Sequence, residues 1–240
     1  MGSGVDTSHW DTVRWGAGRL RVGPWRGDAS VAYLAPIGDG PAPTADAIRR
    51  ACAALLGRGY REAVTAALGP VEARGFLAAG FEIHERLHLL ARDLHDLPAA
   101  PLATLRRGRR TDRAAVLDVD ARAFDRFWRL DHAGLDEALT ATPTSRFRVG
   151  EAADGSVAGY AVTGRAGRRG FVQRLAVDPA HQGCGLGSAL VLDGLTWLRR
   201  RNAGRVVVNT QEANEAALRL YERLGFRRQH DGLAVLTTRV

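Results

Sequence analysis

Glycines alternate with other residues where an apolar strand gives way to a helix, in the segment 177–188, VDPAHQGCGLGS. Glycine leaves consecutive backbone N–H groups free to converge on one point. The first turn of the following helix adds unpaired donors and a partial positive charge. Such a bend binds phosphate oxygens. The sequence therefore predicts a site for a phosphorylated ligand at the start of the helix near residue 187.

Three glycine-rich patterns compete for this segment. A Walker-type loop needs a lysine after its last glycine, and all 34 basic residues of the chain are arginines. A dinucleotide fingerprint needs a third glycine where Ser188 stands and an acidic residue after the next strand, which ends in Asn209 and Thr210. The pattern Gln/Arg-x-x-Gly-x-Gly/Ala is matched by residues 182–187.

A second motif supports this third pattern. Residues 214–226, NEAALRLYERLGF, match Asn-x-x-Ala-x-x-x-Tyr-x-x-x-Gly-Phe. With both motifs in order, residues 171–226 resemble the core of the GNAT superfamily, the acetyl-CoA-dependent N-acetyltransferases. The resemblance implies an α/β (α+β) GNAT fold, with a mixed central sheet flanked by helices, and acetyl-CoA as the co-substrate; no metal is expected.

The resemblance also implies roles for particular residues. The strand before the loop is expected to splay from its neighbour, so that its backbone pairs with the pantetheine arm in the manner of an added strand. The implied pantetheine contacts are Leu175, Ala176, Val177 and Asn214, and the implied pyrophosphate site is Gln182, Gly183, Cys184, Gly185, Leu186, Gly187 and Ser188. Asn214 has the alternative role of a helix cap, and Leu175 and Val177 are expected to place their side chains in the core.

Acetyl transfer to an amine needs a neutral amine, a polarised thioester carbonyl and a proton for the departing thiolate. By resemblance, the Tyr221 hydroxyl faces the CoA sulfur as general acid; the alternative is that Tyr221 only packs between helix and sheet. No general base is assigned. Glu151, Asp131, His132 and His181 have suitable chemistry, but each fits a solvated surface position, and a water chain is a further route for the proton.

The acceptor is predicted to be a primary amine of a small molecule or a protein. The resemblance places its site on variable segments, here 125–142 and 164–170. Phe127 and Trp128 are candidate lining residues, or else core. The arginines of the second segment, Arg165, Arg168 and Arg169, favour an acidic acceptor.

A Pro/Ala stretch at 97–101 predicts a boundary between a domain at 1–96 and a domain at 97–240. The predicted elements past it are a strand at 102–105, helices at 111–127 and 131–140, a hairpin at 147–162, a strand at 171–177, a helix at 185–201, a strand at 205–209, a helix at 214–224 and a closing strand pair at 226–240.

The N-terminal part echoes the second half of this unit. A strand at 32–36, a helix at 44–56 capped by Thr44, a strand at 62–66 and a helix at 71–79 precede Gly80-Phe81, which parallels Gly225-Phe226. The segment 37–43 has no glycine loop, and its prolines remove the donors a phosphate needs. The N-terminus is therefore predicted to be a truncated, degenerate GNAT-like unit, and its join after Phe81 resembles that of tandem enzymes of the mycothiol synthase type.

The amino-acid composition limits the compartment and the partners that we expect for this protein. No run of about twenty apolar residues is present, so no membrane partner is expected, and two cysteines, Cys52 and Cys184, favour a reduced cytoplasmic setting. The net charge of +8 fits a polyanion, but the arginines are spread along the chain, which argues against nucleic acid. A monomer and a homodimer both stay open. The alternative to an enzyme is a catalytically inert, regulatory CoA-binding module.

Overall fold

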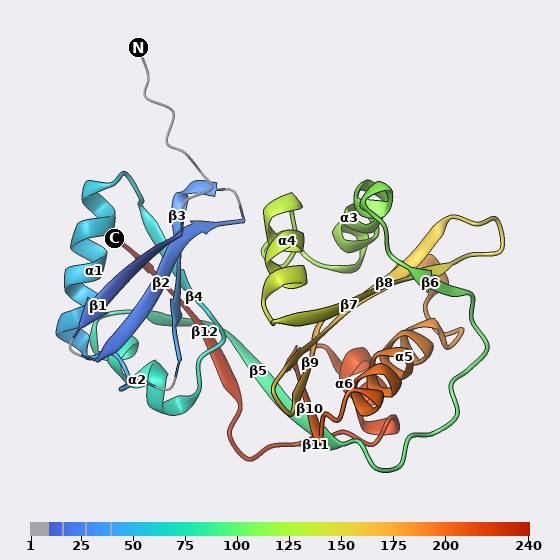
Figure 1. The fold of residues 1–240 in the computed structure, drawn as a ribbon. Coiled ribbons are helices and arrows are strands. Elements are labelled where there is room, and N and C mark those ends of the chain that lie inside the picture. The colour runs from blue at the N-terminus through green and yellow to red at the C-terminus, as the bar shows by residue number, and fades with distance from the viewer. Residues whose placement is uncertain (1–9, 16, 27, 39) are drawn as a thin grey trace. The chain divides into compact units, whose positions relative to one another are not determined.

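The computed structural model describes residues 10–15, 17–26, 28–38 and 40–240 (Figure 1). The chain divides into two compact units. The first comprises Met1–His88 together with His230–Val240, and the second comprises Leu89–Gln229. The unit boundary therefore falls inside strand β5 (Glu82–Asp93), ahead of the Pro/Ala stretch at 97–101, and the last residues of the chain return to the first unit.

The second unit is built on a mixed sheet. Its strand order is β5-β10-β9-β8-β7-β6, and β11 pairs with β5 outside this path. The strands are β6 (Leu105–Arg107), β7 (Thr144–Glu151), β8 (Val157–Ala166), β9 (Arg169–Val177), β10 (Arg205–Gln211) and β11 (Arg227–Arg228). Neighbours from β6 to β9 are antiparallel, whereas β9 and β10 are parallel and joined by a helix.

Helices cover both faces of this sheet. Helices α3 (Arg113–Ala123) and α4 (His132–Thr140) lie on one face, and α5 (Leu186–Arg200) and α6 (Glu215–Arg223) lie on the other (Figure 1). Strand β8 shows the alternation that permits this. A Cβ on Gly159 would meet Leu186 and Leu190 of α5, whereas the next residue, Tyr160, clusters with residues of α3. Both faces of the sheet are therefore buried.

Strands β9 and β10 separate part of the way along. Their parallel pairing joins Arg205–Val207 to Arg169–Phe171 and goes no further, although β9 continues to Val177. On its other side β9 stays paired with β8 as far as Val177, across a bulge. The backbone of 172–177 thus has one ladder edge without a strand partner, as expected for the strand before the glycine loop.

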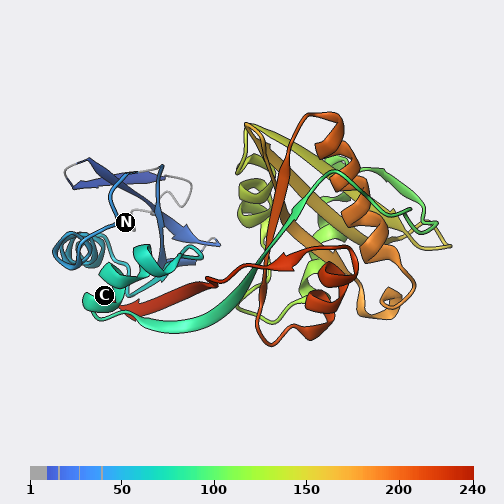
Figure 2. The ribbon, with the colours of Figure 1, turned by 90° about the horizontal axis from the view of Figure 1, so that it is seen from below.

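The first unit contains a smaller mixed sheet with the order β1-β2-β3-β4-β12-β5. Its further strands are β1 (Asp11–Trp15), β2 (Gly18–Trp25), β3 (Asp28–Pro36), β4 (Glu62–Thr65) and β12 (Leu233–Arg239), and its helices are α1 (Ala45–Gly57) and α2 (Pro70–Ala78). Figure 2 shows β12 running beside β5, with which it pairs antiparallel. A separate apolar core supports this unit, with Phe76 and Leu236 fully buried in it.

The first unit repeats the plan of the second. The order β3-α1-β4-α2-β5 matches β9-α5-β10-α6-β11, and in both cases the first two strands are parallel. The first unit differs in one respect, because its parallel strands β3 and β4 do not separate as β9 and β10 do. Strands β3 and β4 stay paired to Leu34 and Thr65, two residues before β3 ends, and Ala66 N–H donates to the Leu34 carbonyl at 2.8 Å.

Some predicted elements differ from the observed ones. The predicted strand at 102–105 is wrong for its first residues, because β6 spans Leu105–Arg107. The helix predicted to reach residue 127 ends at Ala123, where Phe124 adopts an extended conformation. The predicted closing strand pair at 226–240 is also wrong, because β11 pairs with β5 and β12 pairs with β4 and β5. Within the described ranges, no helix is both long and apolar enough to span a bilayer.

Candidate functional site

The glycine loop between β9 and α5 has the backbone shape that its sequence predicts. Gly183 has a φ of 80° and Gly185 a φ of 89°, a left-handed conformation that residues with a side chain rarely adopt. Gly185 is also the N-cap of α5, with no side chain to occupy the first-turn amides. The loop therefore needs glycine at these two positions for its backbone conformation.

The amides of the loop point to no other group of the described chain. The first helical hydrogen bond recorded at this end of α5 is Ala189 N–H to the Gly185 carbonyl, so the N–H groups ahead of it have no backbone acceptor. Side chains hold the loop from outside, since Gln182 donates from Nε2 to the Val177 carbonyl and Cys184 donates from Sγ to the His181 carbonyl. A helix N-terminus with free amides provides a site for an anion.

Asp178 fixes the turn that leads into the loop. Its carboxylate accepts from the Ala180 amide at 2.9 Å and from Arg122 Nε at 2.7 Å. The backbone hydrogen bond from Ala180 and the bond from Arg122 hold the pKa of the Asp178 carboxyl below its usual value. The carboxylate is thus charged and already paired, and it stabilises the turn rather than opposing an anionic ligand.

The strand end, the loop and α6 meet at Gly187. A Cβ added there would lie 3.5 Å from Leu220 Cδ2 and 3.6 Å from Val177 Cγ2. Leu175 and Val177 are partly buried against the core on the α5 side, as expected, and Ala176 is buried on the opposite face. The unpaired edge of β9, the free amides and α6 therefore border one region of the second unit.

Tyr221 lies on α6 and is 4% exposed. Its ring packs edge-on against Phe226 at 5.4 Å between centroids, and its hydroxyl has no hydrogen-bond partner among the described residues. Burial raises the pKa of the Tyr221 phenol, and the nearby positive charge of Arg174 opposes that shift only in part. The phenol is therefore protonated at neutral pH and free to donate.

Asn214 caps α6. Its side-chain oxygen accepts from the Ala217 amide at 3.0 Å, which confirms the capping role that the sequence left open beside a ligand contact. The amide nitrogen of the same side chain donates to no described residue.

A buried ionic cluster that the sequence did not reveal lies on the other face of β9. Asp120 of α3 is fully buried and accepts two hydrogen bonds from Arg174, both at 2.8 Å, and one from the Tyr160 hydroxyl at 2.5 Å. It also accepts from the Leu130 amide at 2.7 Å, and Arg174 donates to the Trp128 carbonyl at 2.7 Å. The cluster fixes the segment between α3 and α4 onto the strand that carries the splay.

The candidate bases are mostly engaged elsewhere. Glu151 pairs with Arg106 at 2.5 Å, and Asp131 accepts from the Gly134 amide at 2.7 Å as the cap of α4. His132 is exposed, and the buried Nδ1 of His181 has no hydrogen-bond partner in the described structure. Within the described ranges, no three His, Cys, Asp or Glu side chains gather as metal ligands would.

The two segments predicted to form the acceptor site, 125–142 and 164–170, lie at different distances from the glycine loop. Segment 125–142 contacts the sheet through the Asp120 cluster, and Gln173 Nε2 donates to Thr142 Oγ1 at 3.3 Å. Gln173 Oε1 is buried with no partner in the described part of the chain. Arg165 lies near the end of β8, and Arg169 is the first residue of β9. The glycine loop follows the other end of β9, about 26 Å further on at roughly 3.3 Å per residue.

The site thus consists of two parallel strands that separate and a glycine loop at the N-terminus of α5. This arrangement is typical of one family of ligand-binding enzymes. The sequence profile of the family described as "Acetyltransferase (GNAT) family" matches residues 113–226. This range holds the loop, the splayed strand and α6.

Curated relatives agree with this match. A mycothiol acetyltransferase from Thermobispora bispora is 35% identical over 200 residues, which cover 75% of this chain and 67% of the relative. A mycothiol acetyltransferase from Streptosporangium roseum is 52% identical over 59 residues, covering 25% of this chain and only 18% of its own length. The chain therefore belongs to the acetyltransferase (GNAT) family, although it spans only a fraction of the length of most of the curated relatives that it matches.

Solved structures show the same fold along nearly the whole chain. A tandem GNAT protein from the clavulanic acid biosynthesis pathway has a TM-score of 0.69 at 17% identity, covering 93% of this chain and 79% of that one. A GCN5-related N-acetyltransferase from Kribbella flavida has a TM-score of 0.65 at 16% identity, covering 95% and 89%. These comparisons confirm the predicted GNAT fold and its tandem plan.

Proposed function

We propose that the second unit binds acetyl-CoA and transfers its acetyl group to a primary amine. The observation that carries the proposal is the combination of the unpaired edge of β9 with the free amides of residues 183–188, because one ligand can use both. An extended pantetheine arm would pair with Leu175, Ala176 and Val177, and its pyrophosphate would accept from the loop amides. Asn214 would add a contact from its free amide nitrogen.

In this mechanism the amine attacks the thioester directly, and Tyr221 protonates the departing thiolate. A buried, protonated phenol with an unused donor fits that role. Neither β9 nor β10 offers a carboxylate to deprotonate the amine, and Glu151 and Asp131 are already hydrogen-bonded. Water beside the unpaired edge of β9 would then carry the proton away.

The acceptor is proposed to be a small-molecule amine related to mycothiol, since the curated relatives are named for mycothiol. Segment 125–142 would form one wall of its site. The buried, unpartnered carbonyl oxygen of Gln173 would accept a hydrogen bond from it.

The first unit is proposed to be a degenerate copy that does not bind CoA. Its parallel strands stay paired, and the Thr44 hydroxyl already accepts from an amide of the first turn of α1. The second unit then carries the complete acetyltransferase domain. The two free cysteines, Cys52 and Cys184, fit a reducing compartment such as the cytoplasm.

Calorimetry with acetyl-CoA, followed by an assay for released CoA with unacetylated mycothiol and a panel of amines, tests the proposal. One-to-one binding with amine-dependent CoA release is the expected result. Absence of acetyl-CoA binding would remove the proposal. Tight binding without turnover on any amine would instead favour the inert CoA-binding module, for which the engaged carboxylates already argue.

A further inference from the structure

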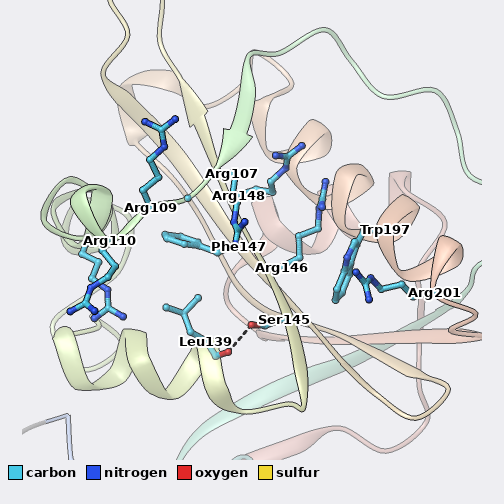
Figure 3. Close-up of a pocket in the computed structure, with 12 residues that line it drawn as sticks. Arg107, Arg109, Arg110, Leu139, Ser145, Arg146, Phe147, Arg148, Trp197 and Arg201 are labelled. Atoms are coloured by element: carbon cyan, nitrogen blue, oxygen red, sulfur yellow. Dashed lines mark hydrogen bonds between the residues drawn. The ribbon is translucent and has the colours of Figure 1, made fainter.

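Two arginine clusters that lie far apart in the sequence meet at one pocket. The pocket has a volume of about 510 Å³ and is lined entirely by residues of the second unit (Figure 3). Arg107, Arg109 and Arg110 reach it from the turn between β6 and α3, and Arg201 reaches it from the end of α5. Their convergence is a property of the fold that neither cluster shows alone.

Three more arginines complete the lining. Arg146 and Arg148 come from β7, which runs between the two clusters, and Arg113 comes from the first turn of α3. No aspartate or glutamate lines the pocket. The lining therefore presents seven guanidinium groups and no carboxylate to one half-open pocket.

The charge of this lining is only partly compensated. Arg146 and Arg148 share a single carboxylate, that of Asp193, and Arg113 pairs with Asp136. Arg107, Arg109, Arg110 and Arg201 form no ion pair with any described residue, and all four are exposed. Seven positive charges thus meet two negative ones at this pocket, and the excess is about five.

The pocket is separate from the glycine loop. Arg201 follows the last residue of α5, whereas the loop is at its first residue, and α5 is 15 residues long. At roughly 1.5 Å per residue the two ends lie about 21 Å apart. The phosphates of a ligand held by the loop amides would not reach these arginines along the helix.

We propose that this arginine pocket binds a small molecule that carries two or more phosphate groups. Guanidinium groups match phosphate oxygens with two parallel hydrogen bonds each, and several guanidiniums gathered at one pocket favour a ligand with several phosphates. The volume is that of a small-ligand site. A nucleic acid is less well matched, because the seven arginines gather at one pocket of about 510 Å³ and do not follow a longer stripe.

Two aromatic rings lie among the arginines. Trp197 and Phe147 line the pocket, and the Arg201 guanidinium lies 5.2 Å from the centroid of the Trp197 ring. The ring limits the positions that Arg201 can take, which lowers the entropy lost when a phosphate binds.

The test uses the full chain with one equivalent of CoA, so that no excess CoA competes for the arginine pocket, and sodium tripolyphosphate as the probe. Titration calorimetry should show one tripolyphosphate per chain, and the double variant Arg107→Ala/Arg201→Ala should raise its Kd about tenfold or more. The matched control is Arg74→Ala/Arg200→Ala, which removes the same charge from exposed residues outside the pocket lining, one of them adjacent to Arg201. The control should change the Kd less than twofold.

Each other outcome overturns the proposal. Equal weakening by both double variants would show a response to overall charge and no site. Orthophosphate binding as tightly as tripolyphosphate would remove the requirement for several phosphates. A single-stranded oligonucleotide that binds more tightly than tripolyphosphate, with the same dependence on Arg107 and Arg201, would assign the surface to nucleic acid. Because CoA is already bound and the readout is calorimetric, failure here leaves the acetyl-transfer proposal untouched.

Discussion

Tyr221 is a buried side chain whose hydroxyl stays accessible. A side chain that is 4% exposed belongs to the core, yet its hydroxyl has no hydrogen-bond partner among the described residues. The hydroxyl oxygen is not among the buried polar atoms that lack a partner, so the small exposed part of Tyr221 includes it, and a ligand can reach it. The same burial raises the pKa of the phenol and keeps its proton in place. Both observations support the proposed role as proton donor.

The variant Tyr221→Phe removes only this hydroxyl. We expect kcat to fall by about 100-fold or more, with the Kd for acetyl-CoA within about twofold of wild type, because the donor acts on the leaving group. Steady-state kinetics and calorimetry measure the two quantities. Tyr60→Phe is the matched control, since Tyr60 is 6% exposed in the core of the first unit. An unchanged kcat in Tyr221→Phe would return Tyr221 to a packing role.

Asp120 is the residue on which the segment between α3 and α4 depends. We expect Asp120→Ala to lower the free energy of unfolding by about 3 kcal/mol or more, because Arg174, which is 11% exposed, would lose its buried partner. Urea unfolding measures the change. Asp118→Ala on the same helix is exposed and should stay within about 0.5 kcal/mol of wild type. Equal effects of the two variants would show that the cluster contributes little to stability.

At the scale of elements, the glycine loop is expected to bind its ligand through its backbone amides and its left-handed backbone conformation. We expect Gly185→Ala to raise the Kd for acetyl-CoA about tenfold, roughly 1.4 kcal/mol, because alanine resists the left-handed conformation of this N-cap. Gly57→Ala, at the end of α1, is the control: an added Cβ there meets no atom within 4 Å, and its φ is not positive. If both variants bind acetyl-CoA like wild type, the loop shape is not what binds the ligand.

Elements with local signals were predictable from the sequence. Helix α1 starts after Thr44, and the predicted Thr44 cap is confirmed by a hydrogen bond from the Ala47 amide. The helix predicted at 131–140 is observed as α4, and Asp131 caps it by accepting from the Gly134 amide. The two family motifs predicted the loop and the splay of β9 in the same way, since both lie within one continuous stretch. These features were predictable because the residues that form each of them are close together in the sequence.

Features made by distant residues were not predictable. Asp120 and Arg174 are 54 residues apart, and neither carries a local signal of the other. The arginine-rich runs 106–110 and 199–201 are far apart in the sequence, and they reach one pocket because β6 pairs with β7 and α5 packs on β7. Strand β12 was predicted to pair with the strand just before it in the sequence. Its true partners, β4 and β5, lie about 150 or more residues earlier, and no local pattern indicates such a distant pairing.

At the scale of the whole molecule, β12 joins the end of the chain to the first unit. Removing residues 230–240 should unfold that unit and leave the second protected, because β12 is the strand between β4 and β5. Hydrogen exchange should increase in peptides from 45–80 and stay low in peptides from 186–200. Leu236→Asp, which places a charge in the first core, should do the same, and Arg239→Ala, which is exposed, should not. Protection of 45–80 in the truncated chain would contradict this dependence.

The position of β12 also sets an order of events during synthesis. Translation delivers β4 and β5 well before residues 233–239, while every strand of the second unit has left the ribosome earlier than β12. Until then the nascent first unit carries two strand edges with unsatisfied amides, a surface that chaperones and neighbouring nascent chains can engage. The second unit can thus complete its sheet first, and the sheet of the first unit closes only when β12 arrives.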